Sequence, residues 1–266
     1  MKRLEKYVAL CLLAALPVVS ACSDSEEPKK PSTEIVQVDI YKSDVDAFQL
    51  EDQYKITYDG KNRISSVHGK FNSQEIAYTY GEKSISYRWE GTNSSTGVFV
   101  NYFEAELRNG RVQVGSVDNK EGVDAVTKIY NYSYHYTSQG YIQDATYGAS
   151  QLFNYEWSNT GLVVKGRPSV YDAQYSYSDV TNDYSLDLNV LPLLVDARTD
   201  VQLAMNMYAQ LAGVLGTRSS YFLQDADYEY DYLFDAEGRL VQIVQAPSSL
   251  KPERQDTYWF MIHYAD

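Results

Sequence analysis

The chain has 266 residues, of which 44% are hydrophobic and 22% are charged. This composition excludes wholesale disorder and is typical of a globular protein. The formal net charge is -13, and such an acidic surface repels phosphate backbones, so we expect no nucleic-acid partner. The unusual feature is the 26 Tyr, whose side chains each combine a large ring with a polar tip.

Residues 1–21 have the pattern of a secretory signal. Three basic residues lie within the first six positions, and an apolar stretch at 7–19 follows, too short to span a bilayer comfortably. The stretch ends in Val19-Ser20-Ala21-Cys22, which resembles the bacterial lipobox. The resemblance implies that Cys22 is acylated, becomes the mature N-terminus and attaches the protein to a membrane through a lipid anchor. The alternative is an ordinary secretory signal that happens to contain a cysteine.

A polar tether is predicted at residues 22–33. Ser23-Asp24-Ser25-Glu26-Glu27 is acidic, and a segment rich in Pro and Lys follows it. Any lipoprotein needs such a spacer, but the acidic run also resembles the export signal of surface-exposed Bacteroidetes lipoproteins. That resemblance implies an outer-membrane lipoprotein exposed at the cell surface, with a periplasm-facing position as the alternative.

Residues 34–266 read as a single all-β domain. Apolar or aromatic residues alternate with polar ones in most segments, as in residues 54–58 and 228–232. Side chains two positions apart share a sheet face, so each such strand has one aromatic face and one polar face. Because the connections are short, neighbouring strands are expected to be antiparallel and to form a long meander.

A loose repeat supports this interpretation. The segment 58–64 aligns with 234–240, and the segments 136–140 and 157–161 keep the same spacing between an aromatic residue and a turn residue. Gly or Asn is expected in such turns because one residue adopts a positive φ. The pattern resembles the Tyr-Asp repeats of Rhs-type proteins, which implies a hairpin for each unit.

The alternation stops between residues 186 and 216. Apolar residues recur at helical spacing from Val201 to Leu211, Thr199 or Asp200 can cap the N-terminus, and Gly213 suits the C-terminal end. We therefore predict a mainly β fold, in which a large antiparallel meander is curled or closed into a barrel-like sheet. The helical insert, about 186–216, is expected to pack on the concave face.

A family resemblance adds to this prediction. The order of Leu186-Asp187-Leu188-Asn189, a helix, Gly213-Val214-Leu215-Gly216 and Tyr-rich hairpins looks like a Bacteroidetes lipoprotein family of unknown function described as having a porin-like fold. The similarity covers about residues 50–266. It implies a barrel-like sheet and supplies no catalytic residues.

Candidate catalytic and metal-binding residues are few. The three histidines, at positions 68, 135 and 263, lie in separate strand patterns without zinc-binding spacing. An acidic ladder is formed by Asp225, Asp227, Glu229 and Asp231. It is expected to be a solvated face that protects against edge pairing, with calcium coordination as the alternative. We expect no enzyme activity, no cofactor and no metal.

The aromatic residues offer the one functional lead. Trp89, Trp157 and Trp259 are the candidate ligand-binding residues, although a Trp in a strand usually belongs to the core. Two functions remain open. The first is a non-catalytic outer-membrane-anchored lipoprotein that binds a glycan or other ligand in nutrient uptake. The second is a structural, adhesive or assembly component of the cell envelope with no small ligand, whose partner is an outer-membrane protein.

Overall fold

The structure is a computed structural model of the chain, and Ser32–Asp266 form one compact unit. Residues 22–31, which include Cys22 and most of the tether, lie outside the described residues, as do Thr199 and Asp200. Within the described part of the chain, no helix combines the length and apolarity that crossing a membrane requires. The structure describes residues 32–43, 48–70, 74–93, 97–121, 128–147, 150–158, 163–167, 173–174, 176–182, 184, 186–192, 201–217, 219, 221–225, 228–247 and 256–265.

The unit is built on a 17-stranded sheet. The strands are β1 (Ile35–Ser43), β2 (Phe48–Tyr58), β3 (Ile64–Gly69), β4 (Gln74–Tyr80), β5 (Ser84–Asn93), β6 (Gly97–Arg108), β7 (Arg111–Glu121), β8 (Lys128–Tyr136), β9 (Ile142–Tyr147), β10 (Ser150–Trp157), β11 (Val163–Arg167), β12 (Ala173–Gln174), β13 (Ser176–Thr181), β14 (Tyr221–Asp225), β15 (Tyr228–Phe234), β16 (Leu240–Pro247) and β17 (Thr257–Tyr264). One helix, α2 (Val201–Leu211), lies between β13 and β14 in the chain.

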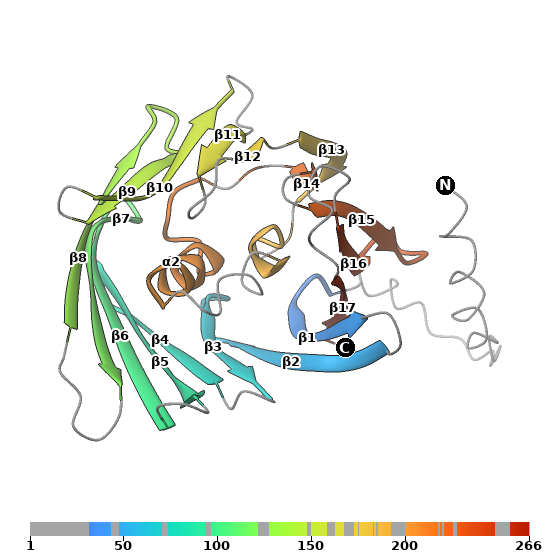
Figure 1. Cartoon of the computed structure of the whole chain (residues 1–266), viewed down its shortest axis with the longest axis horizontal. Coiled ribbons are helices and arrows are strands. Elements are labelled where there is room, and N and C mark those ends of the chain that lie inside the picture. The colour runs from blue at the N-terminus through green and yellow to red at the C-terminus, as the bar shows by residue number, and fades with distance from the viewer. Residues whose placement is uncertain are drawn as a thin grey trace, which may run out of the picture. The chain divides into compact units, whose positions relative to one another are not determined.

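The strand order confirms the predicted antiparallel meander. Strands β1 to β12 pair in chain order, as do β13 to β17. The last strand then pairs with the first, with Val38 opposite Ile262. β12 and β13 are separated in the chain by residue 175 alone. The sheet is therefore strongly curled and barrel-like, and Figure 1 shows its strands curving around α2.

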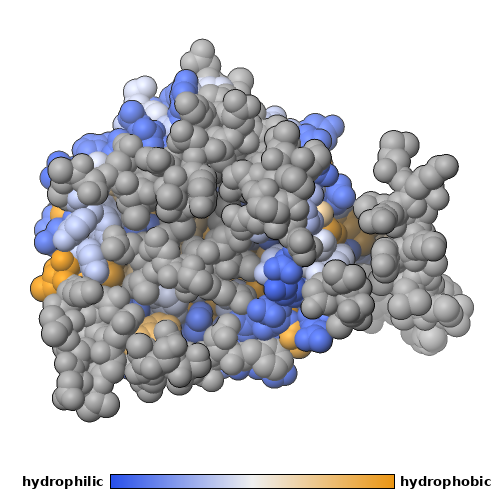
Figure 2. All heavy atoms as spheres, in the orientation of Figure 1, coloured by the Kyte–Doolittle hydropathy of each residue, from blue (hydrophilic) through white to orange (hydrophobic). Residues whose placement is uncertain are grey.

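The two faces of the sheet differ in polarity as the alternation predicts. In β4 the inward Ile76 and Tyr78 are buried, whereas the intervening Glu75, Ala77 and Thr79 are exposed. The same pattern holds in β15, where the side chains of Tyr228 and Tyr230 are buried and the acidic residues between them are exposed. Hydrophilic residues accordingly cover most of the coloured surface in Figure 2.

The aligned turns of the sequence repeat have the same hydrogen bonds. In the β2–β3 turn, Asp59 Oδ1 accepts from the backbone N–H of Lys61 at 2.8 Å and of Arg63 at 3.0 Å. Asp235 Oδ1 accepts equivalent bonds from Glu237 and Arg239 at 3.0 and 2.8 Å. The residue three positions after the aspartate has a positive φ in both turns, as predicted: 57° at position 62 and 79° at position 238.

Aromatic side chains form a series of hydrogen bonds at the rim of the sheet where these turns lie. Each donates a hydrogen bond to the backbone carbonyl at the start of an earlier strand, where main-chain pairing ends. The donor and acceptor pairs are Tyr58 to Ile35 at 2.7 Å, Tyr80 to Ile64 at 3.0 Å, Tyr136 to Val112 at 2.6 Å, Trp157 to Ile142 at 2.6 Å and Tyr264 to Leu240 at 2.7 Å. This recurring role accounts for part of the high tyrosine content.

The helical insert lies inside the curled sheet, as predicted. Residues 204–209 of α2 are all buried and Leu211 is 2% exposed, so the helix packs around its circumference rather than along one stripe. It ends in a Schellman motif, because the N–H of Gly213 donates to Gln210 at 2.8 Å and that of Val214 donates to Ala209 at 3.2 Å. Residues 190–192, earlier in the insert, are also helical.

Tyrosine hydroxyls from the inner face of the sheet hold α2 in place. Tyr78 donates to the carbonyl of Tyr208 at 3.1 Å, and Tyr87 donates to the carbonyl of Met205. Tyr134 donates to the amide oxygen of Asn206 at 2.7 Å. These bonds give the buried tyrosine hydroxyls hydrogen-bond partners.

Candidate ligand-binding surfaces

The structure places the three candidate tryptophans in different environments. Trp89 is 2% exposed and packs against Phe99 and Tyr208, so its ring is not presented at the surface. Trp157 is partly buried, stacks on Tyr141 and uses its indole N–H in the rim hydrogen bond. Trp259 lies on the outer face of β17, because its neighbour Phe260 is fully buried.

Trp259 belongs to an aromatic group on the outside of the sheet. Tyr41 lies opposite Trp259 in the β1–β17 register, and Phe48 of β2 completes the group. The Tyr41 and Phe48 rings stack with centroids 4.8 Å apart, and Phe48 meets Trp259 edge to face at 5.0 Å. Phe48 is 60% exposed, so this outer aromatic cluster (Tyr41, Phe48 and Trp259) presents ring surface to solvent.

A polar group adjoins the cluster on the same face. Asp39, two residues before Tyr41 on β1, is surrounded by side chains from its own strand and both neighbouring strands. Its Oδ1 accepts from Gln37 Nε2 at 2.9 Å and from Gln53 Nε2 at 2.7 Å, and its Oδ2 lies 3.0 Å from His263 Nε2. Each glutamine retains an amide oxygen and a second N–H that can bind a ligand.

Charged side chains near the cluster have polar partners. Asp39 Oδ2 lies 3.0 Å from the imidazole Nε2 of His263, and Lys42 Nζ lies 2.8 Å from Asp256 Oδ2. The hydrogen bond to Asp256 is the main cause that raises the pKa of Lys42, which keeps this pair ionised at neutral pH. Aromatic rings beside amides and compensated charges favour an uncharged ligand that has both apolar and hydroxyl-bearing surfaces.

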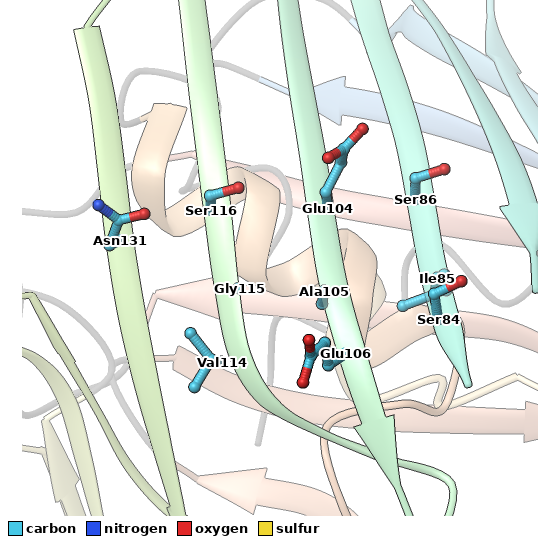
Figure 3. Close-up of a pocket in the computed structure, with 10 residues that line it drawn as sticks. All are labelled: Ser84, Ile85, Ser86, Glu104, Ala105, Glu106, Val114, Gly115, Ser116 and Asn131. Carbon is cyan, nitrogen blue, oxygen red and sulfur yellow. The ribbon is translucent and has the colours of Figure 1, made fainter.

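A second surface feature is a hollow on the outside of β5–β8, with a volume of about 630 Å³. Figure 3 shows Ser86, Glu104, Ser116 and Asn131 in one row across the four strands, in agreement with the strand register. Ser86 and Ser116 have short side chains, so Glu104 projects further from the sheet than they do. None of the ten lining residues is aromatic, so this hollow offers hydrogen bonds without a stacking surface.

The titratable candidates from the sequence stay apart from one another. His135 pairs with Asp144 at 2.6 Å, His263 pairs with Asp39, and His68 is exposed on β3. Glu229 and Asp231 of the acidic ladder are exposed on the outer face of β15, and Asp227 lies outside the described residues. Within the described ranges, no group of three or more His, Cys, Asp or Glu side chains could hold a metal ion.

Sequence reasoning missed most of the outer cluster. Tyr41, Phe48 and Asp39 join Trp259 only because the first strand pairs with the last, across more than 200 residues of chain. A bulge between Ile40 and Tyr41 in the β1–β2 ladder also sets the register of Phe48. The local alternation in β1 could have placed Tyr41 on the polar face, but no local signal identifies its neighbours.

These features define a barrel-like antiparallel sheet with a buried helical insert and a polar outer face. Solved structures with a similar fold include two porin-like proteins. The one from Bacteroides uniformis ATCC 8492 has a TM-score of 0.55 and 12% identity, covering 88% of this chain and 98% of that chain. The one from Bacteroides vulgatus ATCC 8482 has the same TM-score and identity, covering 88% of this chain and 99% of that chain. No family model and no curated protein matches the sequence.

Proposed function

We propose that this chain is a non-catalytic lipoprotein, anchored in the outer membrane and displayed at the cell surface, that binds neutral glycans at the outer aromatic cluster. The exposed ring of Phe48, which packs against Trp259 beside the Asp39 polar group, carries the proposal. Sugars present apolar C–H faces to aromatic rings, while amides and carboxylates bind their hydroxyl groups.

The proposed location rests on the sequence and on the polarity of the sheet. The lipobox-like segment that ends at Cys22 supports a lipid anchor, and the acidic tether supports surface display. The outward side chains of Lys55, Glu75 and Arg88 are charged and exposed, whereas a sheet that faces lipid needs an apolar outer band. We therefore place the sheet in water beside the membrane, with the lipid as its attachment.

The charge of the protein narrows the ligand class. A formal net charge of -13 creates a potential that repels sulfated and uronic sugars at low ionic strength. Neutral oligosaccharides avoid this repulsion, and they do not require an unpaired charge from the side chains around the cluster. Neutral sugars should therefore bind more tightly than anionic sugars of the same size.

The test uses the lipid-free mature chain, residues 22–266 with Cys22→Ala, titrated with a panel of neutral oligosaccharides. Binding should change tryptophan fluorescence, and anionic analogues should compete poorly. Trp259→Ala should weaken binding about tenfold or more, equivalent to ~1.4 kcal/mol. Trp157→Phe keeps the outer cluster intact and serves as the matched control, so its affinity should equal that of the parent.

A flat titration across the neutral panel, with the protein folded, would contradict glycan binding. The outer cluster would then favour the second function, in which this apolar surface contacts a protein of the envelope. Cross-linking at position 48 in intact cells would identify such a contact directly, because Phe48 is the most exposed ring of the cluster.

A further inference from the structure

A row of apolar side chains crosses the outside of the sheet and extends the outer aromatic cluster. Tyr41 of β1 lies opposite both Leu50 of β2 and Trp259 of β17. Trp259 in turn lies opposite Val244 of β16. Each of the four is half-buried. Leu50, Tyr41, Trp259 and Val244 therefore form one line across four adjacent strands, which we call the outer strip.

The outer strip faces solvent rather than the core. Successive side chains of a strand point to opposite faces of the sheet, and the neighbours Ile40, Ile243 and Phe260 are at most 1% exposed. Leu50 shares the outer face with Tyr41, because directly opposed residues of paired strands point to the same side. Part of each side chain in the outer strip is thus accessible from outside.

Hydrogen-bonding side chains border the outer strip on both long sides. Each bordering row lies two residues along the strands, which is about 7 Å from the strip. The row nearer the rim consists, from β2 to β16, of Gln53, Asp39, Met261 and Gln242. On the other side, Ser43 of β1 lies opposite Thr257 of β17. A single apolar row therefore runs between amide and carboxylate groups on one side and hydroxyl groups on the other.

The dimensions of the outer strip identify the kind of ligand that fits it. Strands lie about 4.8 Å apart, so the strip is about 14 Å long from β2 to β16, and it is one side chain wide. A standard protein interface buries roughly 800 Å² on each partner, far more than this strip offers. A linear sugar chain is only one ring wide, and it carries its hydroxyl groups along both edges.

The pattern also selects among sugar chains. A pyranose ring with equatorial hydroxyls and linkages presents C–H groups on its faces and hydroxyls around its edge, which matches an apolar row between two polar rows. An axial group would lift the ring from the strip, and an axial linkage would bend the chain away from it. One unit of an extended chain is similar in length to one strand spacing, so the strip accommodates roughly three units.

On the basis of the proposed glycan binding, we infer that the outer strip selects an extended neutral chain of three or more equatorially linked sugar units. The chain lies across β2, β1, β17 and β16 with its ring faces on the strip. Its edge hydroxyls bind the Gln53 and Gln242 amides on one side and the Ser43 and Thr257 hydroxyls on the other. Trp259, in the middle of the strip, contacts an internal unit of the chain.

The test is a calorimetric titration of the lipid-free mature chain with Cys22→Ala. The probes are β-1,4-linked glucose oligomers of one to six units and α-1,4-linked glucose oligomers of the same lengths. The affinity for the β-linked series should rise about tenfold or more from the disaccharide to the tetrasaccharide and then become constant. The α-linked oligomers, which coil, should bind more weakly and show no such rise.

A variant at the β16 end of the outer strip tests the path of the chain. Val244→Glu should lower the affinity for the β-linked tetrasaccharide about tenfold and change that for the disaccharide less than about twofold, because the disaccharide needs only the outer aromatic cluster. Val114→Glu makes the same charge change at an outer position of β7 that is 54% exposed, and it should leave both affinities unchanged. If Val244→Glu does not fold, Gln242→Ala should weaken tetrasaccharide binding about threefold.

The outcomes separate this inference from the proposed function. Equal affinities for the disaccharide and the hexasaccharide, or α-linked oligomers that bind as tightly as β-linked ones, would overturn the selection of an extended chain while glycan binding stands. Binding of another neutral oligosaccharide without any β-linked oligomer would do the same. Unchanged tetrasaccharide binding by the folded Val244→Glu variant would exclude the path across β16. A chain that binds no neutral oligosaccharide would contradict the proposed function itself.

Discussion

At the scale of single residues, Tyr80 and Tyr264 each have two roles at the rim. Their hydroxyls donate to carbonyls at the start of β3 and β16, and their rings support the guanidinium groups of Arg63 and Arg239, whose Cζ atoms lie 4.1 and 5.0 Å from the ring centroids. Burial raises the pKa of Tyr80 to about 12. Its hydroxyl therefore remains a donor throughout the physiological range.

The Asp59 turn should make stability depend on pH in the acid range. Hydrogen bonds from the side chain and backbone of Arg63 lower the pKa of Asp59 to about 2, below the unfolded value of about 3.9. The stabilisation of the folded state by the ionised Asp59 carboxylate is therefore complete above about pH 4 and is lost as the pH falls toward 2. Asp59→Asn should lower the urea midpoint at pH 7, and the difference from the parent should shrink between pH 4 and pH 2.

Glu237→Gln is the matched control for this experiment. Glu237 is 51% exposed at its side chain and lies 3.9 Å from Arg239, so its removal should change the midpoint little at any pH. A difference between Asp59→Asn and the parent that stays constant from pH 7 to pH 2 would contradict the proposed role of the ionised carboxylate.

At the scale of elements, the C-terminal end of α2 depends on backbone conformation. Gly213 has a φ of 74°, and no atom lies within 4 Å of an added Cβ. The cost of Gly213→Ala is therefore conformational strain alone, and we expect about 1 kcal/mol of destabilisation. Gly60→Ala, which also meets open space but has no positive φ, should be neutral or slightly stabilising in the same urea titration.

The burial of α2 makes a second prediction for this element. Leu211 is 2% exposed inside the curled sheet, so Leu211→Ala should lower the free energy of unfolding by about 2–5 kcal/mol. Leu233→Ala removes the same atoms from an outer position that is 54% exposed, and it should cost less than about 0.5 kcal/mol. Equal melting temperatures for the two variants would mean that α2 does not pack as a core helix.

At the scale of the whole molecule, the helical insert fills the interior of the curled sheet. A sheet of this size encloses more space than the side chains of its own inner face can fill. The insert supplies the buried Leu186, Leu188 and Leu191, together with residues 204–209 of α2, which are also buried. Its exit is fixed to the rim, because Val112 N–H donates to Val214 at 3.0 Å and Thr217 N–H donates to Gly140 at 2.9 Å. These two hydrogen bonds therefore connect the C-terminal end of the insert to the rim of the sheet.

Attachment of the whole molecule to the membrane is expected to depend on one thiol. Cys22→Ala removes the sulfur that the proposed acylation requires. The variant should move from the membrane pellet to the soluble fraction when cells are fractionated. Retention in the pellet after a high-salt wash would contradict lipid anchoring through Cys22. Ser20→Thr keeps the cysteine and serves as the control, with membrane attachment unchanged.

The sequence by itself determined the features that depend on local chemistry. Alternation defined which residues face inward, as in β4 and β15. The spacing of Asp59 and Asp235 to the following turn residues predicted the hairpins, and the break in alternation at 186–216 located the buried helix. Each of these follows from side chains only a few positions apart, whose geometry is set by the period of a strand, a turn or a helix.

Only the tertiary structure decided which residues form a surface. Trp89, Trp157 and Trp259 look alike in the sequence, but the fold puts the first in the interior, the second at the rim and the third on the outer face. The pairing of β1 with β17 brings Tyr41 to Trp259, and the register of β2 with β1 and of β16 with β17 extends this row to Leu50 and Val244. Such contacts depend on the pairing of the first strand with the last and on register, and both are set by packing between distant strands rather than by local sequence.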